Sequence, residues 1–191
     1  MLEHIPSALG QALKGFRPGV DKLTVMSADF AAVPETIAVT STAFANGAPI
    51  PSRYTEDGAK VSPPLAWSGI PDNTAAVVLL VEDADSPTLS PLVHAIAWNL
   101  AAADGMLEEG MLKSEGSGGW PQALGKNSFF KAEYLPPDPP SGHGAHHYAF
   151  QVFALDKVLD FEDEPGRSAV VEAMKAHVLA KGYLIGLYER S

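Results

Sequence analysis

Apolar residues in the middle of the chain fall into short runs that are typical of β-strands. The three clearest runs cover residues 75–82, 92–100 and 147–155, and clusters of proline and glycine separate them. Short runs bounded by such turn residues favour an antiparallel or mixed β-sandwich over alternating strands and helices. The pattern holds from about residue 36 to residue 156. It predicts a mainly β fold with few helices.

The N-terminal residues follow a helical pattern instead. Apolar side chains recur at spacings of three and four residues, at Leu2, Ile5, Leu9, Leu13 and Phe16. Residues 1–34 are therefore predicted to form an extension with an amphipathic helix, and residues 35–191 a single β-rich domain. The polar side of this helix has too few basic residues for a membrane-surface helix. We expect the helix to pack on the domain or on a second copy of the chain in a homodimer.

The C-terminal residues predict a helix followed by a last strand. Ser168 is a suitable N-cap after Pro165 and Gly166. An apolar stripe at Val171, Met174 and Val178 extends the predicted helix to about residue 180. Residues 183–189 are then typical of a final strand.

Composition and charge narrow the classes of partner. The 191 residues carry 13 basic and 23 acidic side chains, a net charge of −10, and no cysteine. This balance argues against general binding to nucleic acids, which requires clustered basic residues. No run reaches the roughly 20 apolar residues of a membrane span, and the N-terminus lacks the features of a secretory signal. We expect a cytoplasmic protein without stable membrane insertion.

Titratable side chains gather near the ends of the predicted strands. Asp83 and Asp85 follow the apolar run 77–81, and His94 lies in the next run. His146 and Tyr148 share one face of the last long strand, because side chains alternate between the two faces. The same alternation would place His94 on one face with Ile96 and Trp98. Several segments that each deliver a polar group near a strand end predict a small pocket at one edge of the sandwich.

These residue types suit a small anion. Two imidazoles and a tyrosine hydroxyl offer hydrogen-bond donors, and the neighbouring carboxylates are expected to raise the histidine pKa. Backbone N–H groups of the glycine-rich loop that follows can contribute further donors. A phosphate group or a carboxylate fits such a pocket better than a long polyanion.

Other chemistries lack their usual motifs. Oxygen and nitrogen ligands for a metal are present at Asp83, Asp85, His94, His143, His146 and His147, but no H-x-x-x-H pair falls on a predicted helix. No G-x-S-x-G sequence indicates a serine hydrolase. The glycine cluster at 116–119 lacks the Gly-Lys-Ser/Thr ending of a phosphate-binding loop. We therefore predict no metal and no cofactor.

Four blocks of sequence, in their order along the chain, resemble the phosphatidylethanolamine-binding protein family in its bacterial and archaeal branch. They are YTEDG at 54–58 with VSPPLAWSGIP at 61–71, EDADSP at 82–87, LVHAIAWN at 92–99, and PPSGHGAHHY at 139–148. The segments GKNSF at 125–129 and LIGLYER at 184–190 support the resemblance. Three positions depart from the family pattern: Ala84 replaces a proline, Leu92 an aromatic residue and His147 an arginine.

The resemblance implies a β-sandwich with flanking helices and a small cavity for phosphate, phosphoryl headgroups or small carboxylates. By position in the motifs, the cavity would be lined by Asp83, Asp85, His94, His146 and Tyr148, with Pro139 and Pro140 forming a wall. Tyr188 is a further candidate. Because some family members are similar to inhibitors of kinases or proteases, a protein partner is also implied.

Three functional classes follow. The first is a binding protein with an anion pocket, and the second is an interaction protein that acts on a kinase or another partner. The alternative is an enzyme of hydrolase, lyase or cyclase type that uses the histidines and aspartates for acid–base chemistry. A cavity larger than a phosphate and lined by Trp98, Trp120 or Phe129 would favour the enzyme.

Overall fold

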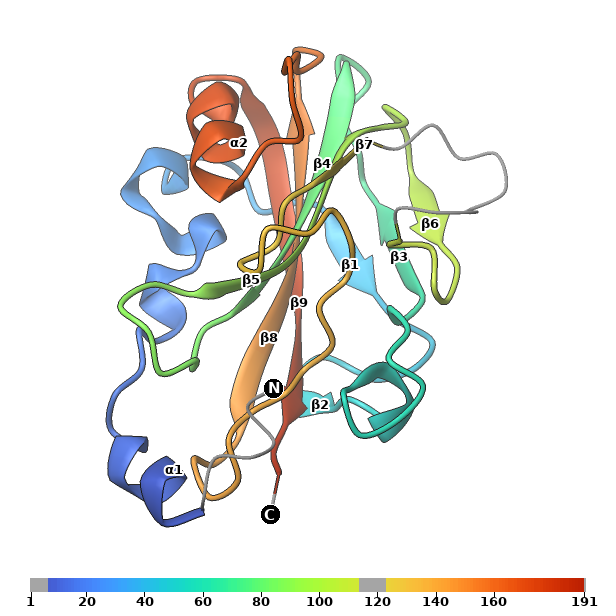
Figure 1. The fold of residues 1–191 in the computed structure, drawn as a ribbon. Helices are drawn as coiled ribbons and strands as arrows, with labels where there is room; N and C mark the ends of the chain where they lie inside the picture. Colours follow the sequence, from blue (N-terminus) through green and yellow to red (C-terminus); the bar gives the residue numbers. More distant parts are fainter. Residues whose placement is uncertain (1–6, 114–122, 191) are drawn as a thin grey trace.

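Two β-sheets of unequal size form the frame of the molecule (Figure 1). The computed structural model describes residues 7–113 and 123–190. The larger sheet has six strands in the order β2-β9-β8-β4-β5-β7, and the smaller sheet has three in the order β1-β3-β6. The strands are β1 Ala38–Thr40, β2 Ala48–Pro49, β3 Leu65–Ser68, β4 Ala76–Asp83, β5 Leu92–Leu100, β6 Gly105–Leu107, β7 Ala123–Gly125, β8 His146–Leu155 and β9 Val178–Tyr188.

The helices are few and short. The α-helices are α1 Ser7–Leu13 and α2 Arg167–Met174, and the 3-10 helices are η2 Val20–Lys22, η3 Thr24–Met26, η4 Ala28–Phe30 and η5 Ser52–Tyr54. With 7 and 8 residues in α1 and α2, no helix in the described ranges has the length and apolarity needed to cross a membrane. The fold is mainly β, as the sequence predicts.

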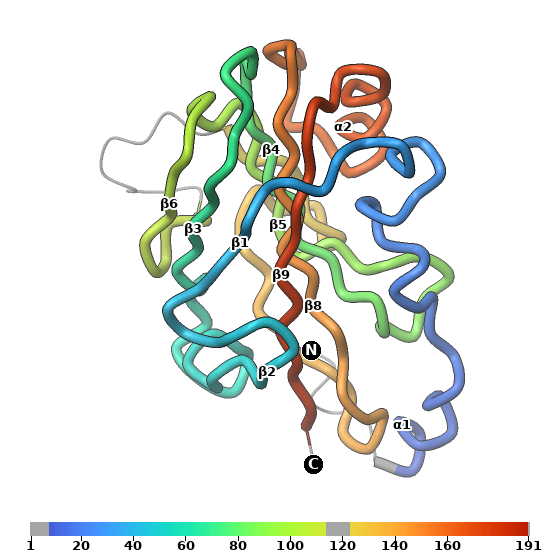
Figure 2. Tube along the Cα trace, turned by 180° about the vertical axis from the view of Figure 1, so that it is seen from behind, coloured from blue at the N-terminus to red at the C-terminus, as the bar shows by residue number. Residues whose placement is uncertain are grey.

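The larger sheet lies between two apolar cores. The smaller sheet covers one of its faces, and α2 with the N-terminal 3-10 helices covers the other (Figures 1 and 2). The inner core, between the two sheets, includes Trp67, Val77, Leu79, Val81, Phe150 and Val152. The outer core, under α2 and the 3-10 helices, includes Leu23, Val25, Phe30, Val78, Leu80, Phe153 and Met174. Side chains of β4 and β8 alternate between these cores, as the period of a strand requires.

The three strands predicted from apolar runs are confirmed. They correspond to β4, β5 and β8, whose ends lie within one residue of the predicted ones. β4 is buried at every position. Because both of its faces are covered, its sequence is continuously apolar from Ala76 to Val81 instead of alternating.

The predicted C-terminal helix is too long. α2 begins after Gly166 instead of at a Ser168 cap, and it ends at Met174. Ala176 then adopts a positive φ of 62°, and β9 begins at Val178, which pairs with Leu155. The long ladder between β8 and β9 satisfies the backbone of this segment, and that tertiary pairing overrides the helical spacing of its apolar residues.

Apolar side chains of the N-terminal stripe pack little on the domain, and their packing on a second copy of the chain stays a prediction. Leu2 and Ile5 lie outside the described residues. Within α1 and just after it, Leu9 and Phe16 are 49% and 48% exposed. The apolar surface of this helix is therefore largely open to solvent.

The N-terminal segment is buried further along, over the 3-10 helices. Leu23, Val25 and Phe30 are at most 1% exposed and belong to the outer core. The Lys181 ammonium of β9 donates hydrogen bonds to the carbonyls of Val25 and Phe30 at 2.8 and 2.9 Å. Residues 23–30 are thus an integral layer of the fold.

A fully buried carboxylate on β4 fastens this layer to the sheet. Glu82 accepts hydrogen bonds from the Thr24 backbone N–H at 2.8 Å and the Thr24 hydroxyl at 3.1 Å. The Gln151 amide and the Arg167 guanidinium donate to it at 2.8 and 2.5 Å. One side chain therefore joins η3, β8 and α2.

Replacing this carboxylate tests its role in the fold. We expect Glu82→Gln to lower the free energy of unfolding by about 3 kcal/mol, because an amide leaves Arg167 without its charge partner and faces other donors. Urea unfolding measures the change. Exposed Glu162 is the control: Glu162→Gln is expected to change stability by less than about 0.5 kcal/mol. Equal effects of the two substitutions would contradict the assignment.

Candidate functional site

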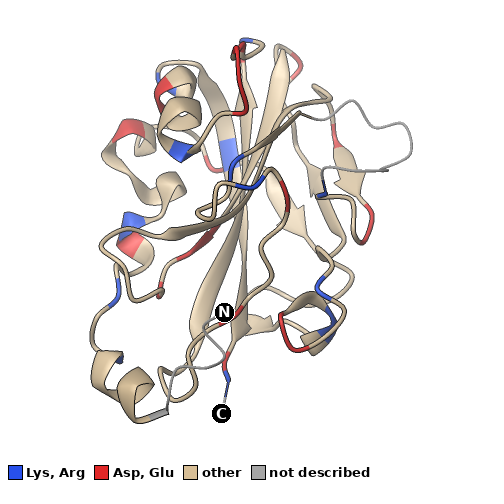
Figure 3. Ribbon diagram, viewed as in Figure 1, with Lys and Arg blue, Asp and Glu red and all other residues tan. Residues whose placement is uncertain are grey.

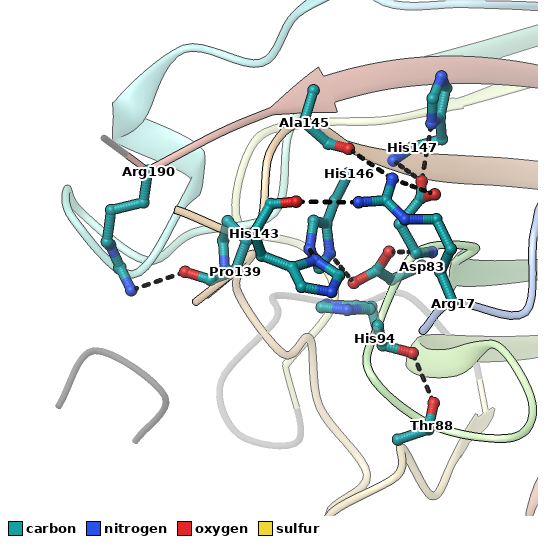
Figure 4. A network of polar contacts seen from close by, with 12 residues as sticks. Arg17, Asp83, Thr88, His94, Pro139, His143, Ala145, His146, His147 and Arg190 are labelled. Carbon is teal, nitrogen blue, oxygen red and sulfur yellow. Dashed lines mark hydrogen bonds and ion pairs between the residues drawn. The ribbon is translucent and has the colours of Figure 1, made fainter. Parts of the chain in front are cut away.

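Polar residues from three neighbouring inner strands of the larger sheet meet where these strands begin or end (Figure 4). Asp83 ends β4, His94 lies near the start of β5, and His146 begins β8. In the ladders, Asp83 lies opposite Leu92 of β5 and Tyr148 of β8. This antiparallel register brings four of the predicted site residues together: Asp83, His94, His146 and Tyr148.

A β-bulge turns the His94 side chain toward Tyr148 and the other site residues. The β4–β5 register shifts between the pairs Val81↔Ala95 and Glu82↔Val93, so His94 is the extra residue. Its ring lies 5.1 Å from that of Tyr148, a residue of the inner core. Ile96 and Trp98 pack in the outer core instead. The expectation that His94 shares their face is wrong, because simple alternation does not allow for the bulge.

The His94 ring is held by a single backbone contact. Its Nδ1 lies 2.6 Å from the carbonyl oxygen of Leu135, and the side chain is buried. Its Nε2 is also buried and has no hydrogen-bond partner among the described residues. Burial lowers the pKa of His94 below its usual value, although Asp83 acts in the opposite direction. The neighbouring carboxylate raises the pKa of His94, as expected, but burial outweighs it and the net shift is downward.

A chain of hydrogen bonds runs from Asp83 through two histidines to the N-terminal segment. His146 Nδ1 lies 2.8 Å from Asp83 Oδ2, and His146 Nε2 lies 2.7 Å from His143 Nδ1. His143 Nε2 lies 2.9 Å from the carbonyl oxygen of Leu13. Each of the three contacts needs one hydrogen, and the carboxylate and the carbonyl at the two ends of the chain only accept. Three hydrogens shared among the Asp83 carboxylate and the two imidazoles give these three side chains together a net charge of zero.

A cavity of about 460 Å³ opens beside these residues. Of the predicted site residues, Asp83, His94, Pro139 and His146 line it. The rest of its lining is formed by Glu56, Lys60, Ser86, Pro87, Leu92, Asn127, Phe129, Lys131, Glu133, Tyr134, Leu135, Pro136 and Asp138. The cavity is thus larger than a phosphate and has both apolar and charged walls.

The acidic groups of the lining are charge-compensated. Lys60 pairs with Glu56, and Lys131 lies 3.3 Å from Glu133. Asp138 accepts a hydrogen bond from Arg190 at 2.5 Å, and Asp83 is bonded to His146. No strong negative field from unpaired carboxylates therefore opposes an anion here.

Tyr148, Pro140 and Tyr188 are not among the residues that line the cavity. The Tyr148 hydroxyl is buried and has no hydrogen-bond partner in the part of the chain that the structure describes, and burial raises its pKa well above the usual value. Pro140 is buried, and its carbonyl accepts the backbone N–H of His143 at 3.1 Å. Tyr188 donates a hydrogen bond to Asp57 at 2.6 Å.

Asp85 faces the N-terminal segment instead of the cavity. Its Oδ1 accepts a hydrogen bond from Arg17 at 2.8 Å, and its Oδ2 accepts the His147 backbone N–H at 2.7 Å. His147 Nδ1 lies 2.7 Å from the same oxygen. Burial alone would raise the pKa of Asp85, but the hydrogen bonds from His147 and the charge of Arg17 outweigh it and lower the pKa.

Two residues around the site were missed by sequence reasoning. Arg17 donates to Asp85 and, at 2.9 Å, to the carbonyl of His143. Nothing local marks it, since the N-terminal segment meets these partners only in three dimensions. His143 was considered only as a metal ligand, although its place in the fourth block, three residues before His146, was a usable signal.

A profile of the phosphatidylethanolamine-binding protein family matches residues 40–189. The chain belongs to this family. A UPF0098 protein of Pyrococcus horikoshii is 40% identical over 152 residues, which cover 78% of this chain and 75% of that protein. A UPF0098 protein of Chlamydia trachomatis is 35% identical over 156 residues, 80% of this chain and 98% of that protein.

Two solved structures of family homologues share the fold. A Chlamydia trachomatis homologue superposes with a TM-score of 0.73 at 34% identity, over 82% of this chain and 99% of that one. Escherichia coli YbcL superposes with a TM-score of 0.76 at 27% identity, over the same shares. The family resemblance seen in the four sequence blocks is confirmed.

Asp85 makes the stability of this region depend on pH. A carboxylate with a lowered folded pKa stabilises the fold above its unfolded pKa of about 3.9, and this contribution is lost as pH falls through the folded pKa. We expect Asp85→Asn to cost about 1–3 kcal/mol at pH 7 and to cost progressively less below about pH 4. Urea unfolding across this range measures the difference.

The control for this experiment is Asp163→Asn, at an exposed position. It is expected to change stability by less than about 0.5 kcal/mol at any pH in the range. A constant difference between the wild-type protein and Asp85→Asn from pH 7 to about pH 3 would contradict the role given to Asp85.

Proposed function

We propose that the cavity binds a small ligand through an oxyacid group: a phosphate, a phosphoryl headgroup or a carboxylate. The observation that carries the proposal is the buried Nε2 of His94: the ring lines the cavity, and this nitrogen has no hydrogen-bond partner among residues 7–113 and 123–190. The Tyr148 hydroxyl, on the adjacent ring, is also without a partner among the described residues, but Tyr148 is not one of the cavity-lining residues. Buried polar atoms are almost always satisfied. A polar group of a ligand in the cavity would satisfy His94 Nε2.

The volume of the cavity indicates a ligand with an organic part. About 460 Å³ lies within the usual range of small-molecule sites and exceeds the needs of one phosphate. Leu92, Phe129 and Pro136 provide apolar wall next to the polar end. A phosphoryl headgroup fits this combination, in keeping with the family to which the chain belongs. A whole lipid with two acyl chains does not.

An enzyme is the alternative function. The cavity is larger than a phosphate and Phe129 lines it, which is the combination expected for an enzyme. Trp98 lies in the outer core instead, and Trp120 lies outside the described residues. His94, oriented by Leu135, has an unprotonated nitrogen of the kind a general base needs. Turnover of a phosphate ester that His94→Ala abolishes would support this alternative over simple binding.

A protein partner is part of the proposal. Leu89 and Phe130 are 87% and 84% exposed, close in sequence to the cavity-lining Pro87 and Phe129. Single exposed apolar side chains are common on protein surfaces, so the proposal of a protein partner rests on the family resemblance. A kinase would be one such partner. Homodimerisation and a cytoplasmic location stay predictions.

Nucleic acid is not proposed as a partner. Lys and Arg are scattered among Asp and Glu along the described parts of the ribbon, without a single basic face in this view (Figure 3). The net charge of −10 also opposes binding to a polyanion.

Ligand-dependent stabilisation tests the proposed function. Phosphorylethanolamine at 100 times its dissociation constant is expected to raise the free energy of unfolding by about 2.7 kcal/mol. We expect this gain to disappear in His94→Ala, because the buried acceptor is lost. Thermal unfolding and calorimetric titration measure it.

The matched control is His177→Ala. His177 is a half-exposed histidine that pairs with Asp156, away from the cavity-lining residues. It should retain the full effect of the ligand. Unchanged binding in a folded His94→Ala protein would show that the site is wrong.

A further inference from the structure

The hydrogen on the His94 ring can be assigned from its one contact. A backbone carbonyl oxygen only accepts hydrogen bonds. Since His94 Nδ1 lies 2.6 Å from the Leu135 carbonyl oxygen, Nδ1 carries a hydrogen and donates it. In a neutral imidazole, the other nitrogen then has a lone pair and no hydrogen.

The surroundings of the ring keep it neutral. Asp83 at the end of β4 and Asp138 in the loop before β8 favour a second proton on the His94 ring, while His146 at the start of β8 opposes it. Tyr148 packs edge-on to the ring and is itself neutral. With 3% exposure, the cost of burying an imidazolium outweighs the two acids, and the pKa of His94 is lowered. Nε2 is therefore a hydrogen-bond acceptor.

Because His94 Nε2 is an acceptor, the ligand has to supply the hydrogen of any hydrogen bond between them. A fully ionised oxygen placed against a buried lone pair is repelled and leaves both atoms without a hydrogen. An oxygen that still carries a hydrogen donates it to Nε2. The ligand oxygen that meets His94 must therefore arrive as O–H, or a proton must enter with it.

We propose that the cavity selects oxyacids that retain a hydrogen, such as a phosphate monoester in its monoanionic form, and discriminates against fully ionised oxyanions such as sulfate. This inference rests on the proposed function and deepens it. Phosphate and sulfate have the same tetrahedral shape, so the hydrogen is what distinguishes them. Sites built to receive a ligand hydrogen reject analogues that lack it by large factors.

The proton balance of binding follows. A phosphate monoester has a second pKa of about 6. Above that pH the dianion dominates in solution, and each molecule bound takes up one proton, which then lies between the ligand oxygen and His94 Nε2. Apparent affinity should fall about tenfold for each pH unit in this range.

Isothermal titration calorimetry with the full chain tests the proposal. Phosphorylethanolamine, inorganic phosphate and sulfate are titrated at pH 7 and pH 8 in two buffers with different heats of ionisation. We expect uptake of about one proton per phosphorylethanolamine bound at pH 8 and roughly tenfold weaker binding than at pH 7. Inorganic phosphate should bind at least about 100-fold more tightly than sulfate at pH 7.

Variants separate the lone pair from the rest of the site. The amide of His94→Gln can offer an N–H to an ionised oxygen, so its affinities for phosphate and sulfate should approach each other and its dependence on pH should flatten. His177→Gln should keep the wild-type preference. If His94→Gln does not fold, the proton count and the phosphate-to-sulfate ratio of the wild-type protein decide the question.

The outcomes distinguish the inference from the function on which it rests. Phosphate and sulfate bound equally tightly, without proton uptake, would overturn the inference and leave the oxyacid site standing. Binding of neither phosphate compound would overturn both. The inference would also be overturned if His94→Gln kept the preference for phosphate over sulfate and still took up one proton. The proton would then bind to a group other than His94.

Discussion

Two consecutive carboxylates at the end of β4 connect the layers of this molecule. Because side chains alternate along a strand, Glu82 enters the outer core and Asp83 faces the site. A buried carboxylate requires hydrogen-bonded partners. Glu82 obtains them from Thr24, Gln151 and Arg167, and Asp83 obtains one from His146. The N-terminal layer, α2 and the first residue of β8 are thereby fixed to one point of the larger sheet.

The N-terminal segment approaches the site through polar contacts, not through its apolar stripe. Arg17 bonds Asp85 and the His143 carbonyl, and the Leu13 carbonyl receives His143 Nε2. Leu13 and Arg17 precede the stretch 40–189 that the family profile matches. The segment therefore contacts residues next to the pocket that the family resemblance implies. It also covers His143 and His146, which together with Asp83 carry no net charge.

Recognition in the proposed site depends more on hydrogen-bond complementarity than on net charge. The acids of the lining are paired with basic groups, and the protein as a whole is acidic. What distinguishes the cavity is the orientation of His94: the Leu135 carbonyl fixes one nitrogen as a donor and leaves the other as an acceptor. In a buried site, a misplaced lone pair is costly because water cannot compensate it.

The sequence by itself determined the mainly β fold, the positions of β4, β5 and β8, and the family, because apolar runs bounded by turn residues and four ordered motifs are local properties of the chain. It also named Asp83, His94 and His146, which line the cavity. Only the tertiary structure decided the rest. The bulge at His94, the start of β9 at Val178, the partnership of Asp85 with Arg17 and the tautomer of His94 all depend on strand register and on partners distant in sequence. Local propensity cannot specify such contacts, because their energy arises only when the segments meet.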